Sequence, residues 1–569
     1  MTRSWRINLI FGLLIVFSAT IIGRLIFLQV IKGEYYRAMA QGQQKSFSEM
    51  EGDRGKIFLQ DRSGNLDSMA INNSSSFVYA VPQEIQDKNV TAETLSTTLN
   101  LGKDEVLNKI ENKDSFYVIL KNKLSDEEVN SLKSLNLPGI ELDEKATRYY
   151  PKEEMACHVI GFLGGDNIGQ YGIEGFYDDV LRGKAEFVAR ERGPLGFSVS
   201  DPEKFLSKNG SDIILSIDNN IQFFSENLLK SAKEEFNIES GQIIVMDPLS
   251  GKILAIAGIP SFNPNYYSKE SDLSIFQNDA IQEAFEPGSS FKPFTMAAAL
   301  DKGALTADTT YVDDGNLRIG GYPITNYDRK IWGERTMHEV LEKSINTGAV
   351  FAERQVGNAF FLEYLKRFGF FQKTGIDLQG EVVSGNKEFN EGRDINFATA
   401  AFGQGIEITP IQLVSAFSAF ANGGKLIKPS VVDKIINWDG KEKEMVPDEG
   451  TDNVEQIISQ NTASQITSML VNVVEKGTAK RAKIPGYYIA GKTGTAQVAY
   501  PSLGIQRSGY SEQTIQTFVG FAPAFNPQFI ALVKLNNPNV RTAEISAVPI
   551  FKDLAKYIID YWQIPPDYE

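Results

Sequence analysis

An almost unbroken apolar run near the N-terminus places the strongest constraint on this chain. Residues 7–23 are apolar apart from three mildly polar positions, and the apolar pattern resumes after Arg24. With a snorkelling arginine, such a run can cross a bilayer core of about 30 Å. Arginines also precede the run, which favours a cytoplasmic N-terminus. We therefore expect a cytoplasmic tail over residues 1–6 and an uncleaved, single-pass signal anchor over residues 7–31.

A cleaved signal peptide is the alternative for this segment. The apolar run is long for a signal peptide, and no clean small-x-small cleavage site follows it. The anchor interpretation places the rest of the chain outside the cytoplasmic membrane. The lack of paired cysteines does not oppose that location, because a large core needs no disulfides.

Composition excludes several classes of function. The chain has 569 residues, of which 42% are hydrophobic and 23% charged, as in a protein of several folded domains. Its 72 acidic residues outnumber its 57 basic ones, which disfavours nucleic-acid binding. A single cysteine and two histidines exclude an internal disulfide and leave little for a metal site. Cys157 and His158 are neighbours, and we expect a buried thiol beside a structural histidine there instead of a catalytic pair.

A polar break at residues 208–212 divides the chain that follows the anchor. Before the break, we expect a helix within residues 33–51, a strand over residues 53–58 and short helices over residues 92–135. After it, the pattern predicts a mixed unit of strands and helices. The elements expected there are strands over 241–247, 252–257, 517–522 and 529–535, a helix capped by Thr409 that stops at 422–424, and a last helix near Pro549.

Ser289 and Lys292 are candidates for nucleophilic chemistry. Pro287 and Gly288 mark a turn, and the almost wholly apolar stretch after Ser289 predicts a buried helix. Ser289 then lies at the helix N-terminus, where free backbone N–H groups stabilise a developing oxyanion, and Lys292 lies one turn further on the same face. A lysine buried there loses solvation, so its neutral form can accept the serine proton. Taken alone, the pair is equally consistent with an N-cap serine and a solvated lysine.

Two further motifs contain side chains suited to peptide recognition. Ser344 and Asn346 fall between two predicted helices, where a hydroxyl can relay a proton and an amide can hold a peptide group; alone, such a pair most often caps a helix. The run Lys492-Thr493-Gly494-Thr495 follows a predicted strand over residues 487–490. Its ammonium and hydroxyls suit a substrate carboxylate at a sheet edge, and its glycine admits a close backbone approach.

Each of two motifs has a second copy in the chain. Ser384 and Lys387 repeat the Ser-x-x-Lys spacing in a polar, glycine-containing stretch that is a poor start for a helix. Residues 373–375 repeat Lys-Thr-Gly without a strand before them. We therefore interpret the first copy as a loop and the second as a connector.

In their order and context, these motifs resemble those of one family. Ser289-x-x-Lys292, Ser344-x-Asn346 and Lys492-Thr493-Gly494 form the three-motif signature of penicillin-binding proteins and serine β-lactamases. Further motifs resemble the class B penicillin-binding proteins, the monofunctional transpeptidases. They are Glu286-Pro287-Gly288-Ser289, Gly403-Gln404-Gly405 before Thr409-Pro410, Gly491 to Gln497, Arg54-Gly55-x-Ile57, Asp61-Arg62-x-Gly64, Arg148-x-Tyr150-Pro151 and Gly172-Ile173-Glu174.

The resemblance covers nearly the whole chain and implies a fold. It is an α/β (α+β) transpeptidase domain of the penicillin-binding and serine β-lactamase type over residues 211–569, with an antiparallel sheet flanked by helices. An elongated α+β pedestal domain of the dimerisation type, over residues 32–210, and a single N-terminal transmembrane helix would precede it.

The resemblance also implies an activity. The chain would be a serine-type D,D-transpeptidase that cross-links peptidoglycan stem peptides through an acyl-enzyme formed on D-Ala-D-Ala, with β-lactams as covalent inhibitors. Ser289 would be the nucleophile, Lys292 its base and Ser344 a proton carrier. Asn346 would hold the substrate amide, and Lys492 with Thr493, Gly494 and Thr495 the terminal carboxylate. The backbone N–H groups of Ser289 and Thr495 would form the oxyanion hole, and no metal or organic cofactor is implied.

The implied partners and role are those of the family's membrane-anchored members. A SEDS-family membrane glycosyltransferase and divisome proteins are expected to contact the chain. The ending directly after the transpeptidase domain, and Gly161-Phe162 after residues 158–160, favour the cell-division type over the elongation type. The alternatives are an elongation-type enzyme, a hydrolase such as a D,D-carboxypeptidase or β-lactamase, and a catalytically idle penicillin-binding scaffold or sensor. The Glu-x-x-Leu-Asn deacylation string of class A β-lactamases is not present, which disfavours rapid hydrolysis.

Overall fold

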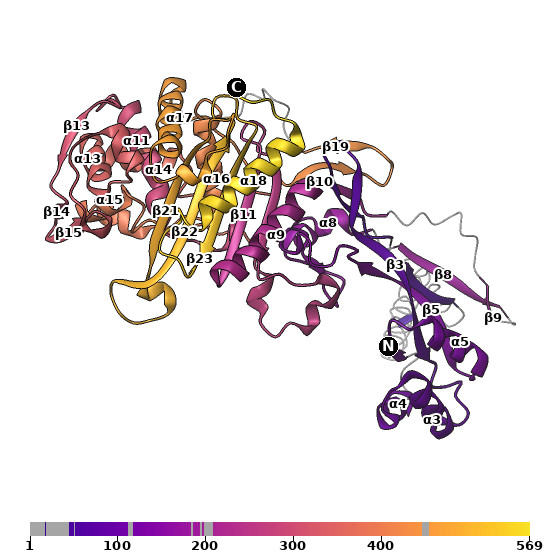
Figure 1. The fold of residues 1–569 in the computed structure, drawn as a ribbon. Coiled ribbons are helices and arrows are strands. Elements are labelled where there is room, and N and C mark those ends of the chain that lie inside the picture. Colours follow the sequence, from indigo (N-terminus) through magenta and orange to yellow (C-terminus); the bar gives the residue numbers. More distant parts are fainter. Residues whose placement is uncertain are drawn as a thin grey trace, which may run out of the picture. The chain divides into compact units, whose positions relative to one another are not determined.

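The fold is described from a computed structural model (Figure 1). The described residues are 17–18, 45–50, 52–111, 118–183, 186–193, 196–198, 209–445 and 455–569. They belong to two compact units, one of residues 1–54 with 182–210 and the other of residues 55–181 with 211–569. The predicted anchor over residues 7–31 lies outside the described residues, except for Phe17 and Ser18. None of the helices in the described part has both the length and the apolar character that a membrane span requires.

The smaller unit contains a three-stranded antiparallel sheet. Its strands are β1 (Lys45–Met50), β8 (Glu186–Gly193) and β9 (Gly196–Ser198), with β8 in the centre. Residues 45–50 therefore form a strand, and the helix predicted within residues 33–51 is wrong for this part. Lys45 pairs with Glu191, a partner far along the chain that local periodicity does not reveal.

The first sheet of the larger unit contains seven strands. Their order is β19-β18-β10-β2-β3-β4, and β5 pairs with β3. Strand β10 runs parallel to β2 and antiparallel to β18, so strands from both sides of residues 208–212 share this sheet. The strands are β2 (Ile57–Gln60), β3 (Leu66–Ala80), β4 (Val118–Lys121), β5 (Ile140–Tyr149), β10 (Asp212–Asp218), β18 (Val432–Ile436) and β19 (Glu442–Glu444).

Gly55 shows why the approach to this sheet needs a glycine. A Cβ atom added at Gly55 would lie 1.9 Å from the carbonyl oxygen of Ser211, far inside contact distance. The next residue along, Lys56, donates its backbone N–H to the Asp212 carboxylate at 2.6 Å. The glycine therefore lets the two backbones meet where β2 and β10 begin to pair.

Three helices pack beside this sheet and confirm the short helices expected over residues 92–135. They are α3 (Lys88–Leu99), α4 (Lys103–Glu111) and α5 (Asp126–Leu135). Asp87 caps α3, and Ser125 begins α5 in a capping box with Glu128. Strand β4, between α4 and α5, was not expected. Leu95, Leu99 and Leu120 belong to the small apolar core that these elements share.

The second sheet of the larger unit is antiparallel, with the order β12-β11-β23-β22-β21. The four strands predicted in this region are present, and β22 starts earlier than the expected residue 517. Strand β21 lies at the edge of the sheet. The strands are β11 (Ser240–Met246), β12 (Ile253–Ile259), β21 (Ala490–Ala499), β22 (Tyr510–Ala522) and β23 (Phe529–Asn536).

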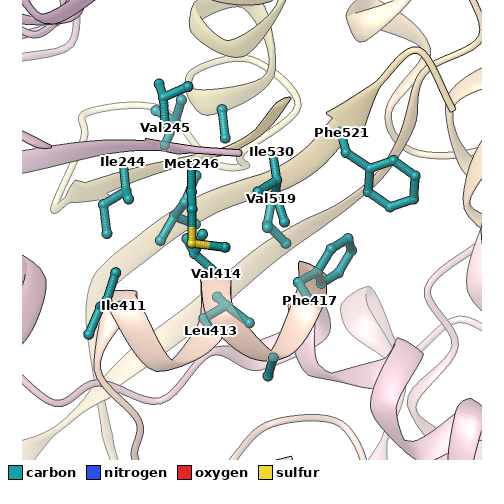
Figure 2. Close-up of a cluster of buried hydrophobic side chains, with 14 of the residues drawn as sticks. Ile244, Val245, Met246, Ile411, Leu413, Val414, Phe417, Val519, Phe521 and Ile530 are labelled. Carbon is teal, nitrogen blue, oxygen red and sulfur yellow. The ribbon is translucent and has the colours of Figure 1, made fainter. Parts of the chain in front are cut away.

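Helices cover both faces of this sheet. Helix α16 (Pro410–Ala421) starts at the predicted cap, Thr409, which forms a capping box with Gln412. It packs against one face, and Figure 2 shows its Ile411, Val414 and Phe417 beside apolar side chains of the strands. Helices α9 (Asn219–Phe236) and α18 (Ala547–Trp562) contact the strands and each other.

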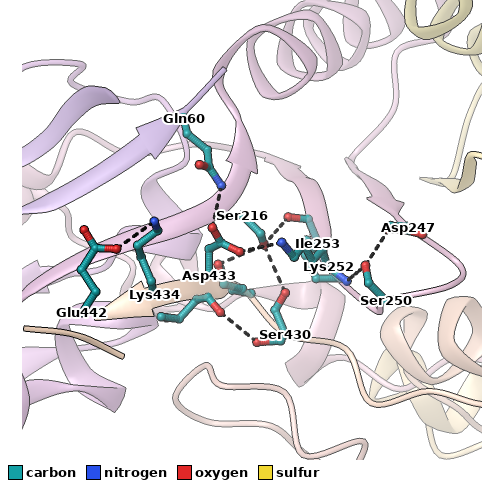
Figure 3. A network of polar contacts seen from close by, with 12 residues as sticks. Gln60, Ser216, Asp247, Ser250, Lys252, Ile253, Ser430, Asp433, Lys434 and Glu442 are labelled. Carbon is teal, nitrogen blue, oxygen red and sulfur yellow. Dashed lines mark hydrogen bonds and ion pairs between the residues drawn. The ribbon is translucent and has the colours of Figure 1, made fainter. Parts of the chain in front are cut away.

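A polar network joins the two sheets of the larger unit (Figure 3). Ser216 Oγ, on β10, donates to the carbonyl oxygen of Ile253, on β12, at 2.8 Å. The Asp433 carboxylate, on β18, accepts from Lys252 Nζ at 2.7 Å and from Gln60 Nε2 at 3.3 Å. The network therefore fixes β12 to β10 and β18.

Further elements are helices and two-stranded pairs. They are α6 (Cys157–Ile160), α7 (Gly172–Phe176), α8 (Asp178–Leu181), α10 (Asp279–Gln282), α14 (Asn358–Arg367), α15 (Asp394–Ala400), α17 (Gln460–Glu475), and the pairs β6 (Phe162–Leu163) with β7 (Gly169–Gln170), β13 (Thr310–Asp313) with β16 (Gly333–Thr336), β14 (Asn316–Ile319) with β15 (Tyr322–Thr325), and β17 (Lys425–Leu426) with β20 (Glu455–Gln456).

Candidate active site

Ser289 lies in a short 3₁₀ turn at the start of a buried helix. The turn, η5 (Gly288–Phe291), leads directly into α11 (Lys292–Asp301). Nine of the ten residues of α11 are buried, as the apolar stretch predicts. Phe294, on this helix, packs against the rings of Phe368, Phe370 and Phe417. The packing gives the first turn of the helix a rigid support.

Gly403 supports the turn from outside. The backbone N–H of Gly288 donates to the carbonyl oxygen of Gly403 at 2.9 Å. A Cβ atom added at Gly403 would lie 2.1 Å from the carbonyl oxygen of Gly288, and the φ angle of Gly403 is +79°. Only glycine satisfies both conditions. The Gly-Gln-Gly motif therefore fixes the backbone immediately before Ser289.

Lys292 faces Ser289 across one helical turn. Lys292 Nζ lies 2.9 Å from Ser289 Oγ. The same nitrogen lies 2.5 Å from the carbonyl oxygen of Ser344 and 3.1 Å from Ser344 Oγ. Its side chain is 1% exposed. Burial first, and the charge of Lys492 second, hold the pKa of Lys292 well below its usual range, so its neutral amine is accessible.

Ser344 lies in a strained turn between two helices. Helix α12 (Met337–Glu342) ends before it, and helix α13 (Asn346–Val356) begins after it. Ser344 has φ of +56°, a left-handed conformation that costs a non-glycine residue about 1–2 kcal/mol. Such strain clusters at functional sites. The turn presents both the hydroxyl and the carbonyl oxygen of Ser344 to Lys292.

Lys492 reaches the same hydroxyl from the edge strand β21. Lys492 Nζ lies 3.0 Å from Ser344 Oγ and 3.1 Å from the carbonyl oxygen of Thr493. The side chain is fully buried, and burial lowers the pKa of Lys492 to about 7. Strand β21 begins at Ala490 and includes the Lys-Thr-Gly motif, whereas the strand was expected just before the motif. The motif lies at the sheet edge, as its proposed contact with a carboxylate requires.

Gly494 and Gly288 bring the nucleophile's turn against β21. A Cβ atom added at Gly494 would lie 2.7 Å from the carbonyl oxygen of Pro287, the close backbone approach that the sequence predicts. A Cβ atom added at Gly288 would lie 3.3 Å from the backbone carbonyl of Thr495. The two backbones from which an oxyanion hole was expected, those of Ser289 and Thr495, therefore belong to segments in direct contact.

A cleft of about 1080 Å³ opens over these residues. Ser289, Ser344, Asn346, Thr493 and Thr495 all line it. Asn346 Nδ2 donates to the carbonyl oxygen of Thr325 at 2.9 Å, which fixes the orientation of its amide. Residues 322–329, which comprise β15 and the segment after it, form another wall of the cleft. Residues 537–544, which follow β23, form a further wall.

Three further residues of the site were not singled out for a role from the sequence. The hydroxyls of Thr478 and Thr493 lie 3.0 Å apart at the cleft. Glu286 Oε1 accepts from the Gly405 N–H at 2.9 Å and from the Tyr510 hydroxyl at 3.2 Å. Burial raises the pKa of Glu286 to about 7. Glu286 belongs to the Glu-Pro-Gly-Ser motif that contributes to the family resemblance, but nothing in the sequence indicates its hydrogen-bond partners.

The second copies of the two motifs form their hydrogen bonds away from this site. Ser384 Oγ donates to the Glu407 carboxylate at 3.1 Å. Thr374 Oγ1 donates to the Glu381 carboxylate at 2.7 Å. Both copies lie in connecting segments, as expected.

Cys157 and His158 form a buried and uncharged pair. Their Sγ and Nδ1 atoms are 3.6 Å apart, and His158 Nε2 lies 3.0 Å from the carbonyl oxygen of Ile275. Burial raises the pKa of Cys157 to about 12 and lowers that of His158 to about 4. Neither a thiolate nor an imidazolium is favoured, which agrees with the structural role expected. Among the described residues, no group of three or more His, Cys, Asp or Glu side chains could hold a metal ion.

Comparison with known proteins identifies relatives of both parts of the chain. The penicillin binding protein transpeptidase domain matches residues 241–556, and the penicillin-binding protein dimerisation domain matches residues 49–215. Stage V sporulation protein D of Bacillus subtilis (strain 168) is 34% identical over 522 residues, covering 90% of this chain and 79% of that protein. The peptidoglycan D,D-transpeptidase FtsI of Escherichia coli (strain K12) is 28% identical over 573 residues, covering 99% of this chain and 93% of that protein.

The fold has solved counterparts. Penicillin-binding protein 3 of Mycobacterium tuberculosis, in complex with aztreonam, matches with a TM-score of 0.69 at 24% sequence identity. The match covers 91% of this chain and 98% of that one. At this level of identity the likeness concerns the fold alone.

Proposed function

The chain belongs to the class B penicillin-binding proteins, which are peptidoglycan D,D-transpeptidases, and on that premise we propose which residues perform the reaction in this chain. The observation that supports the assignment best is the position of Lys292 Nζ, 2.9 Å from the Oγ atom of Ser289, which lines the cleft. A serine with a desolvated lysine as its neighbour has a base within hydrogen-bond distance.

Acylation begins with attack of Ser289 Oγ on the carbonyl carbon of the penultimate D-Ala. A neutral Lys292 has one lone pair and two N–H groups. The lone pair accepts the Ser289 proton while the N–H groups donate to the two oxygens of Ser344. The three contacts of Nζ therefore match the hydrogen-bonding capacity of an amine. The backbone N–H groups of Ser289 and Thr495 bind the oxyanion that forms.

The intermediate collapses when the C–N bond to the terminal D-Ala breaks. The leaving nitrogen takes a proton from Ser344 Oγ. Lys292, which received the Ser289 proton, then donates a proton to Ser344 Oγ. An amine of a neighbouring stem peptide then attacks the acyl ester and gives up one proton. The C–O bond to Ser289 breaks, Ser289 Oγ regains a proton, and the new amide is released. Asn346 holds the substrate amide, and Lys492 with Thr493 and Thr495 binds the terminal carboxylate at the edge of β21.

The domain assignment that accompanies this function follows the sequence motifs. Residues 1–6 form a cytoplasmic tail, residues 7–31 a transmembrane anchor, residues 32–210 a pedestal domain and residues 211–569 the transpeptidase domain. The catalytic domain then lies outside the cytoplasmic membrane, where peptidoglycan is cross-linked. The likeness to proteins named FtsI and stage V sporulation protein D supports a division-type role over the elongation type. A SEDS-family glycosyltransferase and divisome proteins are the partners that such a role requires.

Labelling with a fluorescent penicillin tests the function and separates it from its alternatives. We expect the membrane fraction to form one fluorescent band at the mass of the chain, and the Ser289→Ala variant to form none. The band should persist for many minutes after excess unlabelled penicillin is added, because a transpeptidase deacylates slowly toward water. Rapid loss of the label would indicate a hydrolase. Labelling without cross-linking of a D-Ala-D-Ala stem peptide would indicate an idle scaffold or sensor.

A further inference from the structure

Asn326 caps helix α13 from outside the helix. The N-cap residue of α13 is Ile345, whose side chain is apolar and cannot accept a hydrogen bond. Asn326, between β15 and β16, supplies the acceptor instead. Its Oδ1 accepts from the backbone N–H of Asn346 at 3.0 Å and from that of Thr347 at 3.2 Å. Two of the helix's first N–H groups are therefore satisfied by a residue 20 positions upstream.

The orientation of the Asn326 amide is fixed by all of its hydrogen bonds. Its Nδ2 donates to Asp313 Oδ2 at 2.8 Å and to the carbonyl oxygen of Lys330 at 3.0 Å. Both N–H bonds of the amide are donated, and Oδ1 accepts from the two backbone N–H groups and lies 3.2 Å from the Thr347 hydroxyl, so the amide uses its full capacity. The side chain is 4% exposed, so these partners are not exchanged with water.

Asp313 holds Asn326 in this orientation. Asp313 Oδ1 accepts from the Thr347 hydroxyl at 2.6 Å and from the backbone N–H of Gly315 at 3.0 Å. Asp313 Oδ2 accepts from Asn326 and from the backbone N–H of Trp332 at 2.9 Å. The carboxylate is 1% exposed and lies at the N-terminal end of α13, where a negative charge is favoured.

The network ends at the strained turn that presents Ser344. On the side of α12, the N–H groups of Ser344 and Ile345 donate to the carbonyl oxygens of Leu341 and Val340 at 3.2 and 2.9 Å. On the side of α13, Asn326 holds the next two N–H groups. The left-handed conformation of Ser344 is thus fixed from both ends.

We propose that Asn326, oriented by Asp313, is a positioning residue that holds Ser344 Oγ between Lys292 and Lys492. The inference rests on the proposed function, because it concerns the proton path through Ser344. Asn326 acts on the backbone beside the turn, because its hydrogen bonds go to Asp313, Lys330, Asn346 and Thr347. Its loss would let the turn relax toward an unstrained conformation and move Ser344 Oγ away from the two amines. A displacement of about 1 Å in such a site can lower a rate by about 10²-fold.

A double-mutant cycle tests the proposal. The second-order rate of penicillin acylation is measured by stopped flow for the parent, Asn326→Ala, Ser344→Ala and the double variant, together with the fraction of protein acylated. If Asn326 acts through Ser344, Asn326→Ala should lower the rate about 10²-fold in the parent and less than about threefold in the Ser344→Ala background. A general structural effect would lower the acylated fraction or reduce the rate equally in both backgrounds.

Asn278 provides a matched control. It is 5% exposed, caps α10 by accepting from the Ala280 N–H at 3.2 Å, and donates to the His158 carbonyl oxygen at 3.4 Å. Asn278→Ala should lower thermal stability without a change in the acylation rate of the folded protein. Asp313→Asn is a second test that preserves volume. Its new NH2 group must face a backbone N–H in either orientation, that of Gly315 or that of Trp332, so the network that orients Asn326 is disturbed. The variant should therefore also slow acylation and also lose its effect in Ser344→Ala.

The outcomes separate this inference from the proposed function. Two results in a parent that is acylated would overturn the positioning role alone. In the first, Asn326→Ala and Asp313→Asn slow acylation as much in the Ser344→Ala background as in the parent. In the second, they change the acylation rate no more than Asn278→Ala does. A parent that forms no penicillin adduct would overturn the proposed function, and the positioning role would fall with it. The structure predicts that the effects of the Asn326 and Asp313 variants on the acylation rate do not add to that of Ser344→Ala, and that only these variants show this.

Discussion

Lys292 and Lys492 approach one oxygen atom, Ser344 Oγ, at 3.1 and 3.0 Å. Two buried amines this close cannot both keep a proton without strong repulsion, and each side chain is at most 1% exposed. The arrangement favours one neutral amine and one ammonium. The distances place Lys292 beside Ser289 and Lys492 beside Thr493 of β21, in agreement with the two roles that we propose.

Replacing Lys292 with arginine separates basicity from charge. A guanidinium stays protonated in proteins, so Lys292→Arg keeps the charge and loses the base. We expect the second-order rate of penicillin acylation to fall by roughly 10²–10⁴-fold, as is typical for loss of a general base. Thermal melting provides the control for folding. A folded variant within about tenfold of the parent rate would exclude the neutral-base role.

Lys492→Ala should affect both the rate and its pH dependence, whereas Lys373→Ala should affect neither. Lys492 is the second cause, after burial, of the lowered pKa of Lys292. In the proposed mechanism acylation requires neutral Lys292, so the rate should fall as the pH drops through the pKa of that residue. Removing Lys492 raises this pKa, and the acid limb of the pH–rate profile should move to higher pH. An unchanged acid limb in Lys492→Ala, or a rate loss in folded Lys373→Ala, would contradict the assignment.

The motif order in the sequence was sufficient to find the residues that the structure brings together. Ser289, Lys292, Ser344 and Lys492 come from a helix start, a helix junction and a sheet edge, and each local context was visible as an apolar run, a turn or a strand. The second copies of the two motifs lack such a context, because they lie in connecting segments. Local pattern and tertiary position agree here because each motif lies at the end or edge of a regular element.

Other features could not be predicted, because their causes are distant in the chain. Asn326 has no local pattern of its own, and its partners lie on both sides of it along the chain. Strand β1 depends on pairing with β8, so the polar composition of residues 45–50 suggested a helix instead. The raised pKa of Glu286 arises from burial, which the hydrogen bonds from Gly405 and Tyr510 offset only in part, and only the fold creates this environment.

Glu286→Gln should increase stability at neutral and alkaline pH. The pKa of this carboxyl is about 7 in the folded protein and about 4.5 otherwise, so the folded state holds an extra proton between these values. The contribution of Glu286 to the parent's stability therefore falls as the pH rises from 4.5 to 7 and stays lower above 7. Glutamine keeps an acceptor for Gly405 and Tyr510 without a charge, so its advantage in Tm should grow over the same pH range.

The comparison needs a control at an exposed glutamate. Glu512 lies on the same strand as Tyr510 and is exposed. The difference in Tm between Glu512→Gln and the parent should stay constant between pH 5 and pH 8. An advantage of Glu286→Gln that is constant or shrinks with rising pH would show that the Glu286 carboxyl is not destabilised by burial.

The N-terminal segment can be tested by intact mass. If residues 7–31 form an uncleaved anchor, protein purified from membranes should begin at the original N-terminus and require detergent for release. Residues 7–23 are apolar enough to remain in the bilayer. A mature N-terminus near Gly23 would show that the segment is a cleaved signal peptide.

Mapping the penicillin adduct tests the central claim most directly. The protein is treated with penicillin, its intact mass is measured, and the modified peptide is sequenced by mass spectrometry in the parent, Ser289→Ala and Ser384→Ala. We expect one adduct with the full mass of the drug, because ring opening adds the β-lactam without loss of atoms. The adduct should lie on Ser289, be retained in Ser384→Ala and be lost in Ser289→Ala. An adduct on any other residue, or an unmodified folded parent, would contradict the account.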